Sequence, residues 1–124
     1  MANSYRDLIV WQRAIQMTVS VYKCSARFPK DEAFGLTSQT RRASVSVASN
    51  IAEGYGRGTR GEYKKFLGIA RGSNCEVQTQ LTIARELGYA SNELLLASEA
   101  KSEEVGKMIF AILKKLATSK VVVD

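Results

Sequence analysis

Histidine is absent from the 124-residue chain, so the residue that most often serves as a general base, triad member or metal ligand is missing. A ferritin-like di-metal bundle is excluded for the same reason, because its Glu-x-x-His pairs cannot form. The sequence also contains no GxxxxGK[ST] phosphate loop and no GxSxG nucleophile elbow. We therefore expect no enzymatic activity, no metal site and no cofactor.

Proline occurs once, at Pro29, and alternating strand-like patterns are few, which favours helices. No apolar run approaches the roughly 18 residues of a membrane-spanning helix. Charged residues such as Arg6 and Arg13 interrupt the first apolar cluster, so no secretory signal is expected. Cys24 and Cys75 lack CxxC spacing and are expected to be reduced packing residues rather than a disulfide. These features predict a cytoplasmic protein.

Hydrophobic residues recur at helical spacing in four segments, at about 8–28, 32–55, 60–88 and 91–116. Pro29 is expected to end the first helix, and Asp31 or Glu32 to begin the second. The third helix is expected to start after Thr59, which has the spacing of a capping box with Glu62. Three glycines should end the second helix and one should end the third: Gly54, Gly56, Gly58 and Gly88.

Four long helices with short connections predict a single domain over residues 1–124, of the all-α class, folded as an antiparallel up-down-up-down four-helix bundle. The first two helices are more apolar than helices buried on one side need to be. In the third, small residues gather opposite the apolar stripe. A glycine inside a helix costs about 1 kcal/mol relative to alanine, and a close contact would offset that cost. Gly68 and Gly72 are therefore predicted to lie in a contact between subunits.

The positive charge is concentrated in one third of the chain. Residues 36–75 contain seven Lys or Arg and two Asp or Glu, which gives +5, whereas residues 1–35 carry +2 and residues 76–124 carry −1. Such an excess predicts a basic patch around the junction of the second and third helices, although a solvated surface would have the same composition. The candidate nucleic-acid ligands are Arg41, Arg42, Arg57, Arg60, Lys64, Lys65 and Arg71.

The start of the third helix adds free N–H groups beside Arg57 and Arg60, which favours an anion there. Tyr55 and Tyr63 flank this region and could stack on bases, but core packing is the favoured interpretation for both.

Structural roles are assigned to four residues, which are Asn50, Glu53, Gly54 and Glu76. Arg41 lies at the edge of an apolar arc, so either it contacts phosphate or it forms an ion pair with a carboxylate such as Glu76 or Glu53. Asn50 and Glu53 lie one turn before the break expected at Gly54. They are predicted to bond backbone groups freed by that break, or to pair with Arg57.

Several motifs together resemble one family. They are Leu8-x-Val10-Trp11-Gln12, Phe28-Pro29-x-x-Glu32-x-x-Gly35-Leu36, Gln39-x-Arg41-Arg42-Ala43, Ser49-Asn50-Ile51-Ala52-Glu53-Gly54-x-Gly56-Arg57 and Glu62-x-x-x-Phe66-Leu67. The chain resembles the bacterial 23S rRNA intervening-sequence proteins over about residues 5–117, and the Asn-Ile-Ala-Glu-Gly-x-Gly-Arg block is highly specific. Thr40 departs from the family pattern, which usually has an apolar residue there.

This resemblance implies an antiparallel four-helix bundle that assembles into a ring, with a homopentamer expected. The chain also looks like the accessory variability protein of diversity-generating retroelements, which binds nucleic acid and a reverse transcriptase. Two functions follow as hypotheses. The first is an oligomeric, non-enzymatic nucleic-acid-binding protein, with RNA favoured over DNA. The second is an oligomeric scaffold that recruits a protein partner, for example a nucleic-acid enzyme such as a reverse transcriptase.

Overall fold

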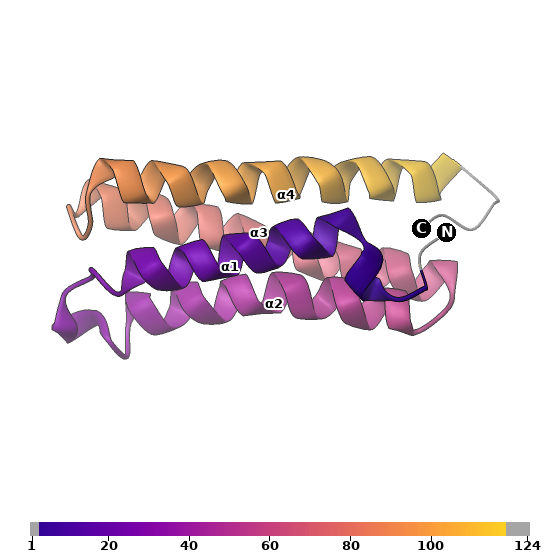
Figure 1. Cartoon of the computed structure of the whole chain (residues 1–124), viewed down its shortest axis with the longest axis horizontal. Coiled ribbons are helices and arrows are strands. Elements are labelled where there is room, and N and C mark those ends of the chain that lie inside the picture. The colour runs from indigo at the N-terminus through magenta and orange to yellow at the C-terminus, as the bar shows by residue number, and fades with distance from the viewer. Residues whose placement is uncertain (1–2, 119–124) are drawn as a thin grey trace.

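Four long helices make up the computed structural model, which describes residues 3–118 (Figure 1). They are α1 (Ile9–Ser25), α2 (Leu36–Gly56), α3 (Arg60–Glu86) and α4 (Asn92–Thr118). Two short 3-10 turns, η1 (Tyr5–Asp7) and η2 (Lys30–Glu32), precede α1 and α2. Each helix packs on the next in the chain, and α1 also packs on α4, which closes the bundle. The all-α, up-down-up-down prediction is confirmed, and no strand occurs in the described part of the chain.

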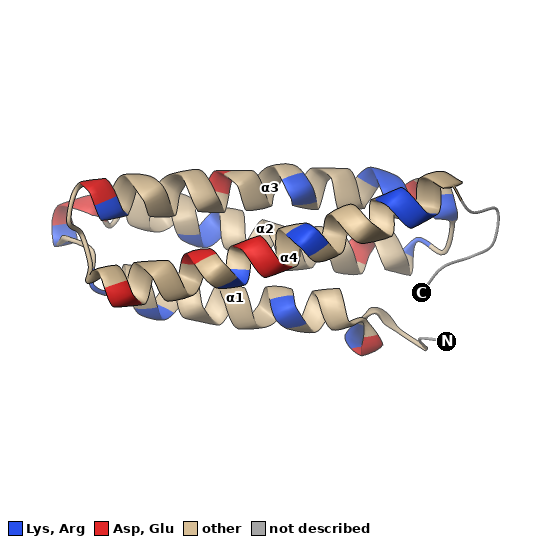
Figure 2. Ribbon diagram, turned by 90° about the horizontal axis from the view of Figure 1, so that it is seen from above, with Lys and Arg blue, Asp and Glu red and all other residues tan. Residues whose placement is uncertain are grey.

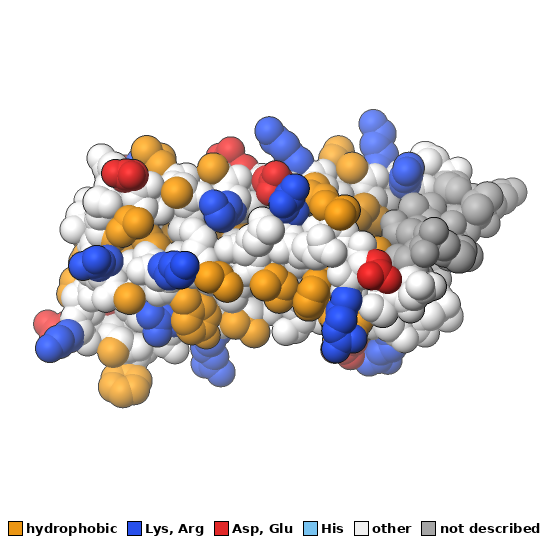
Figure 3. Space-filling model, in the orientation of Figure 1, with side chains coloured by type: hydrophobic (Ala, Val, Ile, Leu, Met, Phe, Trp, Pro, Cys, Tyr) orange, Lys and Arg blue, Asp and Glu red, His pale blue; other side chains and the backbone are white. Residues whose placement is uncertain are grey.

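The core is built from the apolar stripes that the sequence pattern predicts. Met17, Ile51, Leu67, Leu81 and Ile109 are among its largest fully buried side chains. Burying such a side chain contributes roughly 1.5–3 kcal/mol, so the four stripes together are the main source of stability. Not every apolar residue is used, however, because a row of them along α1 remains on the surface (Figure 3). This row includes Ile15, Val19 and Tyr22.

The helix ends differ from the predicted ones where short-range hydrogen bonds intervene. The segment after Pro29 forms only a 3-10 turn, and α2 begins at Leu36, whose backbone N–H donates to Glu32 Oε1 at 3.0 Å. Glu32 therefore caps α2 from outside rather than starting it. Thr59 caps α3 as predicted, accepting the Glu62 N–H at 3.2 Å.

Gly54 does not end α2, because the helix continues to Gly56 and the chain turns at Gly58, whose φ is +80°. Gly54 is instead buried against α3. A Cβ at this position would lie 2.6 Å from the Cβ of Phe66, so only glycine lets the two helices approach this closely. The close spacing of α2 and α3 at this point depends on the absence of a side chain at Gly54. Gly88, with φ +69°, ends α3 as predicted.

Each seam between neighbouring helices contains at least one polar contact among its apolar residues. The Thr18 hydroxyl donates to the Ser44 carbonyl between α1 and α2, and paired hydroxyls join Ser46 to Ser73 and Ser20 to Ser98. Between α3 and α4, Asn74 is 2% exposed and bonded twice to Ser102. Because these groups are satisfied only when the correct turns face each other, they specify the register of the bundle. Buried Thr40 is satisfied within α2, donating to the Leu36 carbonyl at 2.7 Å.

No helix within residues 3–118 is long and apolar enough to cross a bilayer. Both cysteines are free thiols, as expected, but only Cys24 is a core residue, whereas Cys75 is exposed on α3. Burial raises the pKa of the Cys24 thiol.

Candidate nucleic-acid interface

The basic residues predicted as one patch lie in several places. Arg41 ties α2 to the end of α1, where its Nε donates to Ser25 Oγ at 2.8 Å and its Nη2 to the Tyr22 carbonyl at 3.3 Å. The guanidinium also lies 4.6 Å from the centre of the Tyr22 ring. The predicted ion pair of Arg41 with Glu53 or Glu76 is therefore wrong, because the end of α1 offers a hydroxyl, a carbonyl oxygen and an aromatic face to a cation.

Arg60 is the first residue of α3 and donates from Nη2 to the backbone carbonyl of Leu116, in the last turns of α4. A cation suits this position, because the unsatisfied carbonyls at the end of a helix carry partial negative charge. The donors that the sequence pattern assigned to a phosphate are thus partly engaged within the bundle.

Arg57 and Lys65 both lie over the ring of Phe66, at 5.1 and 5.7 Å from its centre. Arg57 also forms the predicted pair with Glu53, at 2.7 Å. This hydrogen bond raises the pKa of the Arg57 guanidinium above its usual value. Because both partners are about half exposed, solvent screens the pair and it contributes little to stability. Asn50 bonds Ser46 instead of the backbone near the break, with its Nδ2 2.8 Å from the Ser46 carbonyl oxygen.

Arg42 lies apart from these residues, in a shallow hollow of about 310 Å³ between α2 and α3. Glu76 lines the same hollow from α3. Among the residues described, no ion pair joins Glu76 to a lysine or arginine. The predicted structural role of Glu76 as a partner of Arg41 is therefore not seen.

A different group of cations lies together across α3 and α4. Arg71 of α3 sits 5.2 Å from the centre of the Phe110 ring of α4, and Lys107 lines the same hollow as both. Lys64 lies two turns before Arg71 on the same side of α3, and Lys114 lies two turns after Lys107 on α4. We call Lys64, Arg71, Lys107 and Lys114 the α3–α4 basic face. Figure 2 shows basic residues of the two helices side by side toward the end of the bundle where α3 begins.

The hollow beside this face has about 360 Å³ and is lined by Arg71, Asn74, Cys75, Gln78, Glu103, Gly106, Lys107 and Phe110. Phe110 is 51% exposed, which is unusual for so large an apolar side chain. Gly106 forms part of the floor, where a Cβ would lie 3.1 Å from the amide nitrogen of Asn74. The hollow therefore combines an exposed aromatic ring with cations at one end.

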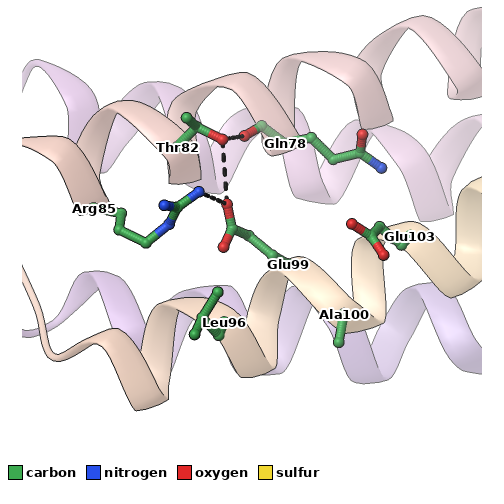
Figure 4. Close-up of a pocket in the computed structure, with 7 residues that line it drawn as sticks. All are labelled: Gln78, Thr82, Arg85, Leu96, Glu99, Ala100 and Glu103. Carbon is green, nitrogen blue, oxygen red and sulfur yellow. Dashed lines mark hydrogen bonds and ion pairs between the residues drawn. The ribbon is translucent and has the colours of Figure 1, made fainter.

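A neighbouring hollow of about 460 Å³ lies further along the same seam (Figure 4). Its centre is occupied by an internal network, in which Glu99 Oε1 lies 3.2 Å from both Arg85 Nη2 and the Thr82 hydroxyl. Gln78 and Glu103 line both hollows and lie on the side away from Arg85 (Figure 4). Within residues 3–118, no group of three His, Cys, Asp or Glu side chains is placed to hold a metal ion.

Sequence reasoning missed Lys107, Phe110 and Lys114, because residues 76–124 have a net charge of −1 and were set aside as a whole. Their spacing of three and four residues on one helix was the signal that could have found them. Tyr55 and Tyr63 pack edge to face, with ring centres 5.5 Å apart, and Tyr63 is buried, which supports core packing. Gly68 and Gly72 are exposed, and nothing lies within 4 Å of a Cβ built on either.

Comparison with known proteins identifies one family. A family model described as 23S rRNA-intervening sequence protein matches residues 6–111. Among solved structures, the chain is similar to a protein of unknown function from the S23 ribosomal protein family of Bacteroides thetaiotaomicron VPI-5482. The TM-score is 0.77 at 22% sequence identity, over 86% of this chain and 99% of that one. This likeness supports the fold. No curated protein matches the sequence.

Proposed function

Since the chain belongs to the 23S rRNA-intervening sequence protein family, we propose that it is an RNA-binding protein without enzymatic activity, and that RNA binds on the α3–α4 basic face. One observation carries the proposal. Four cations from two helices share one side of the bundle, and no ion pair within the described part of the chain neutralises any of them. RNA is a cytoplasmic ligand in bacteria, and a cytoplasmic location is part of the proposal.

The contacts of Arg71 suit it to this role. Its interaction with Phe110 uses the flat face of the guanidinium and holds the side chain in place, which is worth about 0.5–1 kcal/mol at an exposed site. A guanidinium that packs on a ring uses its face, so the N–H donors in its plane can still bind phosphate oxygens. The three lysines add point charges along a face that is long enough to follow an RNA backbone.

Charge reversal tests the assignment. We expect Lys64→Glu combined with Lys107→Glu to weaken binding of a single-stranded RNA at least tenfold, and to make the slope of log affinity against log salt shallower by about 1–2. The matched control is Lys23→Glu combined with Lys101→Glu, which makes the same charge change on exposed lysines away from the face. Equal losses in the two variants would show that only net charge matters and would contradict the proposal. Circular dichroism establishes that both variants fold.

Self-association into a ring, with a pentamer expected, is the second element of the proposal. It would multiply a modest RNA affinity through several linked faces. The exposed apolar row on α1 supports a contact between copies, because it leaves surface that a neighbouring helix could cover. Sedimentation equilibrium of the full chain gives the number of copies directly.

A second candidate function is a scaffold for another protein, such as a reverse transcriptase. The observation in its favour is Phe34, which is 99% exposed in the connection between α1 and α2, at the opposite end from the α3–α4 basic face. Exposed aromatic residues are common anchors of protein interfaces. Capture of one stoichiometric protein after nuclease treatment, lost in Phe34→Ala, would favour the scaffold.

A further inference from the structure

The hollow around Phe110 has two ends of different chemistry. Arg71 and Lys107 lie at the end toward the start of α3, where both can bind phosphate. Gln78 and Glu103 lie at the other end, one to two turns away, and offer an amide and a carboxylate. The half-exposed ring of Phe110 lies beside the cations. A site for a simple anion would not include Glu103, and a site for an apolar peptide would not include four charged or amide groups.

A nucleotide has the matching arrangement. Its phosphates are anionic, and its base is flat and aromatic. The edge of the base carries N–H groups that can donate hydrogen bonds to a carboxylate or an amide oxygen. Bases in a duplex are stacked and paired, so only an unpaired base can present both its face and its edge to a protein. We propose that this hollow binds one unpaired nucleobase of the RNA, stacked against Phe110, with its edge toward Gln78 and Glu103 and its phosphates on Arg71 and Lys107.

The floor of the hollow supports this assignment. Gly106 packs closely on Asn74, since a Cβ there would lie 3.1 Å from the Asn74 amide nitrogen, and the lack of that Cβ means that no side chain of this residue fills the hollow. Asn74 itself is held by Ser102 on α4 through two hydrogen bonds, of 2.9 and 2.8 Å. The floor is therefore held in a fixed position. A volume of about 360 Å³ lies at the lower end of the range of small-ligand pockets, as expected for a single base.

This inference rests on the proposed function and makes a narrower claim, that the protein prefers single strands and uses an aromatic contact. The test compares a single-stranded RNA of mixed sequence with a duplex of the same length, by fluorescence anisotropy at constant salt. Phe110→Ala should weaken binding of the single strand about tenfold and leave duplex binding within about twofold. Phe110→Trp keeps an aromatic ring and should restore single-strand binding. Phe34→Ala removes another exposed phenylalanine ring, at the other end of the bundle, and serves as the control.

A second readout reports on the base itself. An RNA with one 2-aminopurine should change its fluorescence on binding the wild-type protein, because stacking alters the emission of this base, and the change should be absent in Phe110→Ala. If Lys64→Glu with Lys107→Glu abolishes binding but Phe110→Ala does not alter it, the base pocket is wrong and the proposed function stands. If Phe110→Ala instead breaks self-association while RNA binding is unchanged, the hollow is a contact between copies and the inference is overturned. If neither RNA form binds, both claims fail.

Discussion

Asn74 and Ser102 bond each other in both directions across the buried seam between α3 and α4. The Asn74 Nδ2 donates to the Ser102 carbonyl at 2.9 Å, and the Ser102 hydroxyl donates to Asn74 Oδ1 at 2.8 Å. The amide of Asn74 is thereby satisfied in a place that solvent does not reach. The pair fixes which turns of the two helices face each other, and Asn74 also lines the hollow beside Phe110.

Removing the hydroxyl should be costly for this reason. Ser102→Ala leaves Asn74 Oδ1 buried without its donor, and we expect the free energy of unfolding to fall by about 1–3 kcal/mol. Urea denaturation followed by circular dichroism measures the change. Ser49→Ala, at an exposed position of α2, is the matched control and should be neutral or slightly stabilising. Equal effects of the two substitutions would contradict a structural role for the pair.

The contact of Glu32 with Tyr89 should give stability a defined dependence on pH. The backbone N–H of Leu36 and the Tyr89 hydroxyl, which lies 2.6 Å from Glu32 Oε2, lower the pKa of Glu32. The same hydrogen bond raises the pKa of Tyr89. Because the pKa of Glu32 is lowered on folding, the ionised carboxylate stabilises the fold at pH values above its usual pKa of 4.5. This stabilisation is lost as the pH falls through the lowered pKa. Because the pKa of Tyr89 is raised on folding, the protonated phenol stabilises the fold at pH values below its usual pKa of 10.0. This stabilisation is lost as the pH rises through the raised pKa.

We therefore expect the wild-type Tm to exceed that of Tyr89→Phe between these two limits. The difference should shrink below about pH 4 and above about pH 10. Differential scanning calorimetry across this range provides the measurement. A constant difference at all pH values would show that the hydrogen bond to Glu32 is not its source, since phenylalanine keeps the ring that packs 5.8 Å from that of Phe28.

Two glycine substitutions should change the free energy of unfolding in opposite directions. Gly54→Ala places a Cβ 2.6 Å from the Phe66 Cβ, so α2 and α3 must separate, and we expect a loss of about 1–3 kcal/mol in the free energy of unfolding. Gly72→Ala meets nothing within 4 Å and should raise the helix propensity of α3, stabilising a single copy by up to about 1 kcal/mol. Thermal denaturation of both variants at low protein concentration compares them.

Larger side chains on the same open surface test self-association. Gly68→Leu with Gly72→Leu should leave the helix content unchanged, because both positions face open space in one copy. If α3 contacts a neighbouring copy there, the added bulk should lower the assembly constant at least tenfold in sedimentation experiments. Wild-type assembly by this double variant would remove Gly68 and Gly72 from the contact.

Substitution of Arg60 should mainly affect stability, whereas substitution of Arg71 should mainly affect RNA binding. Arg60→Ala leaves the Leu116 carbonyl without its partner and should cost about 1 kcal/mol of stability, with little change in RNA affinity. Arg71→Ala removes one exposed cation of the α3–α4 basic face and should weaken RNA binding severalfold, with a smaller effect on unfolding. Paired measurements of Tm and RNA affinity give both values. The opposite result would favour the interface predicted at the start of α3.

The helices were predictable because apolar residues repeat at 3.6-residue spacing along nearly the whole chain. Two kinds of information were not. Gly54 lies inside α2 because it is needed for close contact with Phe66, and that contact is between helices. The partners of Arg41 and Arg60 are backbone carbonyls at the ends of other helices, and a carbonyl carries no mark in the sequence. The cations of α4 were overlooked because acidic residues elsewhere on that helix cancel them in a count.

The two hydrogen bonds between Asn74 and Ser102 also bear on how fast and how tightly a ligand could bind. Because Asn74 is already held by Ser102, this part of the hollow needs no rearrangement when a ligand binds. Little conformational entropy is therefore lost on binding. Association should then be limited by diffusion and electrostatic attraction, and a partner would encounter the same shape in every molecule.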